Sequence, residues 1–285
     1  MELKAYAKIN LGLRILKKRP DGYHDIESIF HYINWFDILE IEKSLQFGFS
    51  CSDPALPADE TNLVVRAVRE IEKETGNPFL FHINLIKKIP YGAGLGGGSS
   101  DASCIISLAK SVYGLSDETC HKMASSLGSD LNFFLDKRTQ IATDRGIILN
   151  PVDFRINSYI LTVFPNVSVS TKWAYQQIKP CSGYPTSYKE ILDNHPSPVD
   201  YRKLFINDFD LPVSKQFETI HHAKQKLNDL GSFYTSLSGS GSAVFGLFEN
   251  KEKAEKAKLV LGREFSVNIT EPDFGIQTEK LTLEF

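Results

Sequence analysis

A two-part α+β fold is predicted by three features of this sequence. Apolar residues alternate with polar ones through much of residues 1–50, which indicates β-strands. Later segments carry helical periodicity but do not alternate strictly with strands, which excludes a doubly wound parallel sheet. The chain has 285 residues, 42% of them hydrophobic, so we expect two domains with sizeable cores, at residues 1–152 and 153–285.

The first half is expected to begin with strands and to continue with helices. Glycines mark the expected helix ends, because glycine readily adopts the left-handed conformation of a helix C-cap. The predicted elements are, in order, strands at 3–15 and 35–42 with a turn at 19–24 between them, a helix that follows caps at 59–61 and stops at Gly76, a strand at 79–85, helices at 99–113 and 116–128, and a hairpin around 140 and 147.

The second half mixes strands and helices in the same way. Its predicted elements are, in order, a strand at 159–164, a loop rich in Pro, Ser and Tyr at 180–198, a long helix at 213–230, two strands that flank 238–242, a charged helix from Asn250 to Gly262, and two short strands at the end. The sequence contains no internal repeat and no low-complexity tail.

Composition limits the partners that the chain can have. The net charge is −3, with both signs spread along the sequence, so nothing draws it to nucleic acid or to anionic lipid. The four cysteines are widely separated and are expected to be reduced thiols. No apolar run approaches the roughly 20 residues of a membrane span. We therefore expect a cytoplasmic protein without nucleic-acid, membrane or obligate protein partners.

The densest chemical signal is a glycine-rich stretch, with five glycines at the seven positions 92–98. Ordering a glycine costs roughly 1 kcal/mol more than ordering an alanine, so such a run indicates that the backbone must approach something closely. A helix is expected to start directly after it, and free N–H groups at a helix N-terminus attract anions. A flexible linker is the alternative, but linkers rarely separate a strand from a helix this closely. The stretch favours a phosphate-binding loop.

Several known phosphate motifs can be compared with this stretch. A P-loop requires a lysine after the glycines, and none is present. Gly92, Gly94 and Gly97 match the Rossmann spacing, but they lie deep in the chain. Protein kinases share the spacing, yet no His-Arg-Asp or Asp-Phe-Gly motif follows.

The stretch at 90–100 resembles the phosphate loop of the galactokinase–homoserine kinase–mevalonate kinase (GHMP) superfamily. Residues 7–11 resemble its first motif and residues 238–242 its third, so three motifs occur in the right order. The resemblance implies a ribosomal-protein-S5-domain-2-like ATP-binding half, a ferredoxin-like second half, and ATP and Mg²⁺ as cofactors. The ATP-binding residues that it implies are Pro90, Tyr91, Gly92, Ala93, Gly94, Leu95, Gly96, Gly97, Gly98, Ser99, Ser100, Ser238, Gly239, Ser240 and Gly241.

Within the superfamily, two segments resemble the cytidyl-methylerythritol kinase branch. Residues 19–24 are similar to a segment that binds cytosine there, which implies that Tyr23 stacks on the base and His24 reads its edge. Residues 165–171 resemble a second segment, which implies that Thr171 and Tyr175 complete the substrate site. The alternatives are an exposed turn for Tyr23 and His24, and a core aromatic for Tyr175.

The resemblance also implies a catalytic pair, Lys8 and Asp130. Asp130 would accept the proton of the substrate hydroxyl, and Lys8 would keep that carboxylate ionised and stabilise the transferring phosphoryl group. Asn10 would orient the hydroxyl or the lysine, and Ser100 would bind magnesium. Asn132 departs from a frequent proline in the segment around Asp130. By itself, Asp130 would be interpreted as a helix cap or a surface ion pair.

The implied reaction is the transfer of the ATP γ-phosphoryl group to a hydroxyl of a cytidine-diphosphate-linked methylerythritol. A kinase for mevalonate, homoserine or a sugar is one rival, and residues 23–24 and 171–175 argue against it because those substrates have no base. A non-catalytic sensor is another, and Lys8 and Asp130 argue against that. Residues 207–210 resemble a further family element, which we interpret as structural support.

Overall fold

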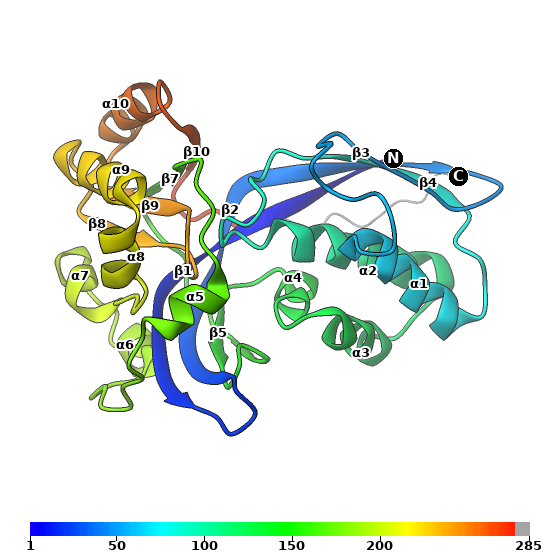
Figure 1. The fold of residues 1–285 in the computed structure, drawn as a ribbon, viewed down its shortest axis with the longest axis horizontal. Helices are drawn as coiled ribbons and strands as arrows, with labels where there is room; N and C mark the ends of the chain where they lie inside the picture. Colours follow the sequence, from blue (N-terminus) through cyan, green and yellow to red (C-terminus); the bar gives the residue numbers. More distant parts are fainter. Residues whose placement is uncertain (277–285) are drawn as a thin grey trace.

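The computed structural model describes residues 1–276 as two β-sheets with helices packed on them (Figure 1). The strands are β1 (Glu2–Lys18), β2 (His24–Lys43), β3 (Gly48–Cys51), β4 (Phe81–Ile86), β5 (Gln140–Thr143), β6 (Ile148–Pro151), β7 (Tyr159–Phe164), β8 (Tyr234–Leu237), β9 (Val244–Phe248) and β10 (Ser266–Thr270). The α+β prediction is confirmed.

The helices lie between these strands, and a 3₁₀ turn at Pro198–Asp200 precedes α7. They are α1 (Leu63–Thr75), α2 (Gly97–Tyr113), α3 (Asp117–Leu127), α4 (Leu131–Asp136), α5 (Thr171–Gln176), α6 (Tyr188–Asp193), α7 (Tyr201–Leu204), α8 (Asp210–Gln216), α9 (Glu218–Asp229) and α10 (Lys251–Leu261). Among the helices in residues 1–276, none is long and apolar enough to cross a membrane.

The first sheet is organised by β2, which is 20 residues long. β1 pairs along one edge of β2, while β4 and β5 pair with different ends of the other edge. β1 carries a bulge at Gly12, where φ is 75°, and the pairing register shifts between Leu11 and Leu13. The alternation of β1 puts Ala7, Ile9 and Leu11 in the core and leaves the opposite face to polar side chains.

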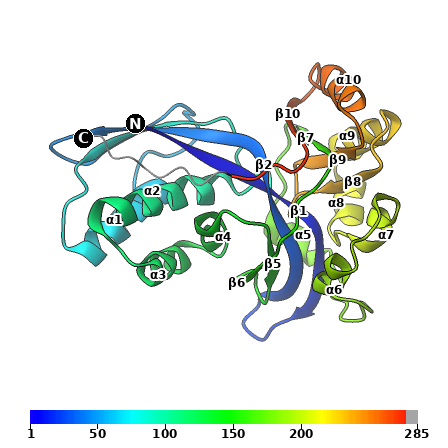
Figure 2. The ribbon, with the colours of Figure 1, turned by 180° about the vertical axis from the view of Figure 1, so that it is seen from behind.

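Helices α1 to α4 cover one face of this sheet, as Figures 1 and 2 show. Apolar side chains of α1 and α2, such as Val68 and Ile105, join Leu39 and Ile83 of the strands in one cluster. The glycine-rich loop lies between the end of β4 and the start of α2. Because both elements pack in this layer, the two ends of the loop are held in place.

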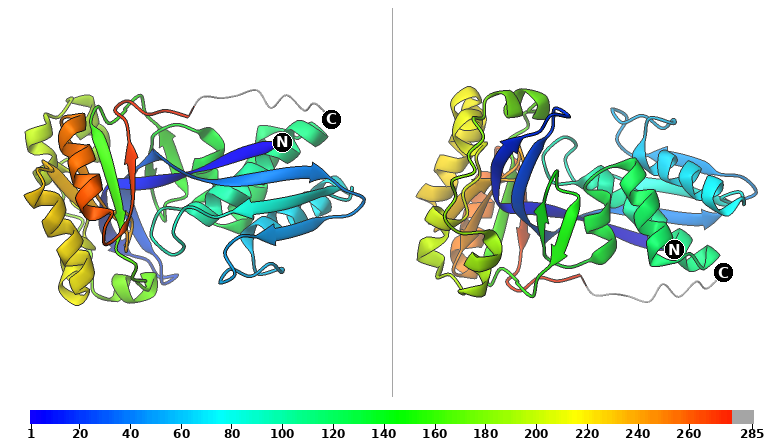
Figure 3. Two further views of the ribbon diagram at one scale, coloured as in Figure 1. Left: turned by 90° about the horizontal axis from the view of Figure 1, so that it is seen from above. Right: turned by 90° about the horizontal axis from the view of Figure 1, so that it is seen from below.

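The second sheet has the strand order β10-β7-β9-β8, and all of its pairs are antiparallel. The connection from β7 to β8 contains α5 to α9, and α10 connects β9 to β10. This strand order with two helical crossovers is a ferredoxin-like fold. The helices α9 and α10 lie on the outer face of the sheet, away from the first half (Figure 3).

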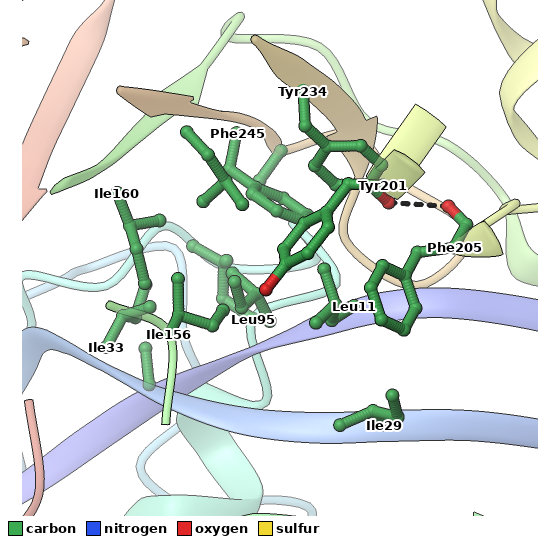
Figure 4. Close-up of a cluster of buried hydrophobic side chains, with 14 of the residues drawn as sticks. Leu11, Ile29, Ile33, Leu95, Ile156, Ile160, Tyr201, Phe205, Tyr234 and Phe245 are labelled. Carbon is green, nitrogen blue, oxygen red and sulfur yellow. Dashed lines mark hydrogen bonds between the residues drawn. The ribbon is translucent and has the colours of Figure 1, made fainter. Parts of the chain in front are cut away.

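A single hydrophobic cluster extends across the two halves (Figure 4). It joins Leu11 and Ile29 of the first sheet to Tyr234 and Phe245 of the second. The buried Tyr234 hydroxyl donates a 2.7 Å hydrogen bond to the backbone oxygen of Phe205. The two halves therefore share a core, and the predicted domain division after residue 152 stays a prediction.

Four sequence expectations about individual elements were wrong. The helix predicted at 213–230 is two helices, because Phe217 is extended and packs edge-on against Trp173. The loop predicted at 180–198 contains α6, which begins with a capping box of Ser187 and Glu190. Helix α1 is capped by Asn62, not by residues 59–61. Helix α2 begins at Gly97, two residues earlier than expected.

At the C-terminal end, β10 is the first of the two predicted short strands. The second falls outside the described residues.

Phe245→Ala tests the shared core. Removing a fully buried aromatic ring should cost about 3–5 kcal/mol of unfolding free energy. Because the cluster spans both halves, urea should unfold both together at a lower midpoint. Single-tryptophan variants that retain only Trp35 or only Trp173 report each half by fluorescence.

Leu259→Ala is the matched control, because this side chain is 67% exposed and its loss should cost under about 0.5 kcal/mol. A lower urea midpoint by Trp173 fluorescence, together with an unchanged urea midpoint by Trp35 fluorescence, would show that the halves unfold independently.

Candidate active site

The glycine-rich loop connects β4 to α2 and takes backbone conformations that favour glycine. Gly92, Gly94 and Gly96 have φ values of 66°, 77° and 72°. Gly97 is not among these left-handed residues, since it is the first residue of α2. The N-terminus of this 17-residue helix meets the loop, so its unpaired N–H groups lie where an anion can bind.

Gly94 makes a close approach to the backbone of the second half. A Cβ atom there would collide with the backbone oxygen of Ser238. The Ser238 hydroxyl donates to the Gly94 oxygen at 2.8 Å, and the Ala243 N–H donates to the Ala93 oxygen at 3.0 Å. The loop and the turn at 238–242, both predicted from sequence, are thus in direct contact.

Residues 207–210 hold this turn in place, as the sequence interpretation expected. The Asn207 amide donates to the backbone oxygens of Leu237 and Gly239 at 3.0 and 2.9 Å. Asp208 accepts from the Ile15 N–H at 2.7 Å, which attaches the same segment to β1.

Lys8 and Asn10 are neighbours on the polar face of β1, two residues apart. The Lys8 ammonium donates to Asn10 Oδ1 at 2.6 Å, and the Asn10 amide donates to Ser28 Oγ at 2.8 Å. The ammonium also lies 5.0 Å from the ring centre of Phe30. Lys8 is 4% exposed, and burial lowers its pKa, whereas nearby Asp130 opposes that shift. Asn10 therefore orients the lysine.

Asp130 precedes α4 as its N-cap residue, but its side chain makes no capping hydrogen bond. It accepts a 3.3 Å bond from the Ser129 hydroxyl. In the part of the chain that the structure describes, Asp130 forms no ion pair with Lys8, although both line one cleft. The Asp130 side chain therefore does not cap α4, and its carboxylate remains available to a ligand.

The cleft has a volume of about 1430 Å³ and also contains the predicted substrate residues Tyr23, His24, Thr171 and Tyr175. The Thr171 and Ser240 hydroxyls are 3.1 Å apart. The His24 ring stacks on Tyr175 with centroids 4.8 Å apart. Burial lowers the pKa of His24, with Lys18 contributing.

Tyr23 is the most exposed of the three aromatic side chains in this set. It is 59% exposed, and the Arg145 guanidinium lies 4.9 Å from its ring centre. The structure brings His24 and Tyr175 into contact and leaves Tyr23 at the rim with Arg145.

A smaller cavity of about 300 Å³ lies on the other side of the loop and shares Gly94 and Gly96 with the cleft. Its walls include Leu56, Leu63 and Tyr91. The segment before α1 was not predicted as part of this cavity, because nothing local in a loop and a helix cap indicates that they face residues 90–98.

A buried ion cluster beneath the loop was also missed. The Lys87 ammonium donates to Asp37 and, at 2.8 Å, to Asp101. Burial raises the pKa of Asp101 although Lys87 opposes the shift, and Asp101 Oδ1 has no hydrogen-bond partner among residues 1–276. Asp101 and Ser99 line the smaller cavity, whereas Ser100 is buried and lines neither cavity described here.

Comparison with known proteins agrees with this geometry. The sequence profile of the GHMP kinases N-terminal domain matches residues 62–135, and that of the GHMP kinases C-terminal domain matches residues 202–267. A protein of Chlorobium limicola named 4-diphosphocytidyl-2-C-methyl-D-erythritol kinase is 39% identical, over 97% of this chain and 98% of its own. One of the same name from Chlorobium phaeobacteroides strain BS1 is 40% identical, over 97% and 99%.

The chain belongs to the 4-diphosphocytidyl-2-C-methyl-D-erythritol kinase family. The crystal structure of a 4-(cytidine 5'-diphospho)-2C-methyl-D-erythritol kinase superposes with a TM-score of 0.81 at 29% identity, covering 95% of this chain and 98% of that one. This family is one of the GHMP kinases, which use ATP as the phosphoryl donor.

Gly94→Ala should weaken ATP binding in this kinase fold at least tenfold, because the added Cβ forces the loop and the 238–242 turn apart. Calorimetric titration of a non-hydrolysable ATP analogue measures the effect. Gly114→Ala is the control: Gly114 has a similar φ of 66°, but no atom of the described part of the chain lies within 4 Å of its added Cβ. It should cost about 1–2 kcal/mol of stability from backbone strain and leave ATP affinity unchanged. Equal loss of affinity in both variants would contradict the close-approach explanation.

Proposed function

We propose that this protein transfers the γ-phosphoryl group of ATP to a hydroxyl of 4-diphosphocytidyl-2-C-methyl-D-erythritol, a step of the non-mevalonate route to isoprenoids. The observation that carries the proposal is the convergence of Lys8, Asn10 and Asp130 in one cleft, beside a glycine loop, in a chain that matches the named kinases over nearly its full length.

ATP is proposed to bind with its phosphates on the glycine loop and its base in the smaller cavity. The loop offers backbone N–H groups and the positive end of the α2 dipole, both of which favour a polyanion. The cavity offers an aromatic and two aliphatic walls for a purine. Because Gly94 and Gly96 line both cavities, the γ-phosphate would point into the large cleft.

Asp130 is proposed to be the general base. Its carboxylate lines the cleft without capping α4, so it can accept the proton of the attacking hydroxyl. That oxygen then bonds to the γ-phosphorus while the bond to the β-phosphate oxygen breaks and ADP leaves. Lys8, held by Asn10, would stabilise the negative charge on the transferring group.

Tyr23, His24 and Tyr175 are proposed to bind the cytosine, with Thr171 near the phosphates. A base that stacks on the covered face of Tyr175 would replace the His24 ring, whose nitrogens would then be free to bond to the base edge. Such stacking supplies affinity for a cytidine substrate that mevalonate or homoserine cannot obtain.

Magnesium is proposed as the second cofactor, and it would neutralise charge on the ATP phosphates. Asp101 Oδ1 is a hard oxygen without a partner beside the phosphate loop, which fits a magnesium ligand, directly or through water. Ser100 and Asp101 are 2% and 1% exposed, so either side chain would first have to turn to reach the ion, and of the two only Asp101 lines the smaller cavity. Because both substrates are charged, water-soluble nucleotides, we place the reaction in the cytoplasm, with no obligate protein partner.

Asp130→Asn keeps the size of the side chain and removes the base. Turnover should fall about 10²–10⁴-fold while affinity for the ATP analogue stays unchanged. Asp193→Asn, at the surface of α6, is the control and should retain normal turnover. Near-normal turnover of Asp130→Asn at saturating substrates would remove Asp130 from the chemistry.

Tyr23→Ala or Tyr175→Ala should raise the KM for the cytidyl substrate about 5- to 150-fold, the equivalent of roughly 1–3 kcal/mol of base stacking. The KM for ATP should not change. Tyr91→Ala, in the smaller cavity, is the reciprocal control and should raise only the KM for ATP. Titration of CMP tests the same pocket without turnover, and no measurable affinity of the unmutated protein at millimolar CMP would exclude a cytosine site.

A further inference from the structure

A buried serine of β2 stands behind Lys8 and Asn10. Asn10 pairs with Phe30 across the two strands, and Ser28 lies two residues before Phe30, on the same face of β2. Ser28 is completely buried, and among residues 1–276 it belongs to the wall of neither the cleft nor the smaller cavity. Any effect of Ser28 on a bound substrate must therefore act through another residue.

The proton of the Ser28 hydroxyl is committed to the β-bulge of β1. Gly12 is the extra residue of this bulge, since Leu11 pairs with Ile29 and Leu13 pairs with Ser28. The Ser28 hydroxyl donates to the Gly12 carbonyl oxygen at 2.7 Å. A carbonyl oxygen can only accept, and a serine has a single hydroxyl proton. Toward any other partner, the Ser28 oxygen can therefore act only as an acceptor.

The orientation of the Asn10 amide is set from both of its sides. Asn10 Nδ2 donates to Ser28 Oγ at 2.8 Å, and Asn10 Oδ1 accepts from the Lys8 ammonium at 2.6 Å. An ammonium can only donate, and the Ser28 oxygen is left as an acceptor. A reversed amide would set two donors against each other at Lys8 and two acceptors against each other at Ser28. Both neighbours therefore require the same orientation.

Burial makes this chain of hydrogen bonds difficult to replace. Asn10 and Lys8 are 1% and 4% exposed, and within residues 1–276 the Lys8 ammonium has no second hydrogen bond and no ion pair. Loss of the Ser28 hydroxyl would leave a buried N–H of Asn10 without an acceptor, which is costly away from water. The amide could satisfy that N–H only by turning, and its oxygen would then leave the Lys8 ammonium.

We propose that Ser28 is a positioning residue of the kinase site. Its hydroxyl, directed by the Gly12 carbonyl, holds the Asn10 amide in the orientation that places the Lys8 ammonium in the cleft. This inference rests on the proposed function, in which Lys8 stabilises the transferring phosphoryl group. Because Ser28 is outside the walls of both cavities, it acts on the rate of transfer and not on the binding of either substrate.

Ser28→Ala should lower kcat with ATP and the cytidyl substrate roughly 5- to 50-fold, the order expected for one lost buried hydrogen bond. The KM of either substrate should change less than about threefold. Ser28→Cys keeps the buried volume but forms only weak hydrogen bonds, so it should be slowed in the same way and serves if the alanine variant does not fold. Ser232→Ala is the matched control: Ser232 is 4% exposed and its hydroxyl donates to the Tyr234 oxygen at 2.6 Å, away from the cleft. It should leave kcat unchanged.

Asn10→Ala separates positioning from general support of the fold. If Ser28 acts through Asn10, adding Ser28→Ala to Asn10→Ala should lower kcat by less than about a further twofold. A readout without turnover is the exchange of the Asn10 side-chain amide protons with water, followed in ¹H–¹⁵N spectra. Ser28→Ala should speed this exchange at least about tenfold, because the buried N–H loses its acceptor.

The proposal is overturned if Ser28→Ala and Ser28→Cys retain normal kcat, or if Ser28→Ala slows the Asn10→Ala protein as much as the unmutated one. Unchanged exchange of the Asn10 amide in Ser28→Ala would overturn it as well. An unmutated protein that does not phosphorylate the cytidyl substrate would refute the proposed function instead, and the exchange of the Asn10 amide would still decide whether Ser28 orients it.

Discussion

The contact between Gly94 and the turn at Ser238 is the constraint on which the site depends. It joins a loop of the first half to a turn of the second, and only a residue without a Cβ allows the approach. The same loop accepts the backbone N–H of Lys8 through Leu95 at 3.0 Å. Lys8, the glycine-rich loop and the second half are therefore positioned by one network, supported by the shared hydrophobic cluster.

That network also explains how a nearly buried lysine is tolerated in the cleft. Burial disfavours the charged ammonium and lowers its pKa, while Asn10, the Phe30 ring and the charge of Asp130 counteract this. A polyanion on the neighbouring loop would favour the charged form further. Part of the electrostatic cost of burying the ammonium would thus be offset by a bound polyanion, which is the arrangement expected where positive charge is useful during phosphoryl transfer.

The parts of the candidate site that could be predicted from sequence are those whose signal is local. A glycine run before a helix and a glycine turn between strands each indicate an unusual backbone conformation from the residues alone. The polar face of β1 is recognisable because polar and apolar residues alternate along the strand. The cluster of Lys87, Asp37 and Asp101 was not predictable, because its members are separated by up to 64 positions and meet only in the fold. The break at Phe217 was missed for a similar reason: packing against Trp173 overrides a periodicity that runs through both helices. Capping chemistry at Ser187 and Glu190, in contrast, was present in the sequence and overlooked.

The central claim is that this cleft phosphorylates a cytidine-linked polyol. In the most direct measurement, the unmutated protein is incubated with ATP and magnesium in three parallel samples. These contain 4-diphosphocytidyl-2-C-methyl-D-erythritol, mevalonate or homoserine, and the products are followed by ³¹P NMR. We expect ADP and one new phosphomonoester resonance, in equal amounts, with the cytidyl substrate alone. A phosphomonoester formed equally well from mevalonate or homoserine, or none from the cytidyl substrate, would contradict it.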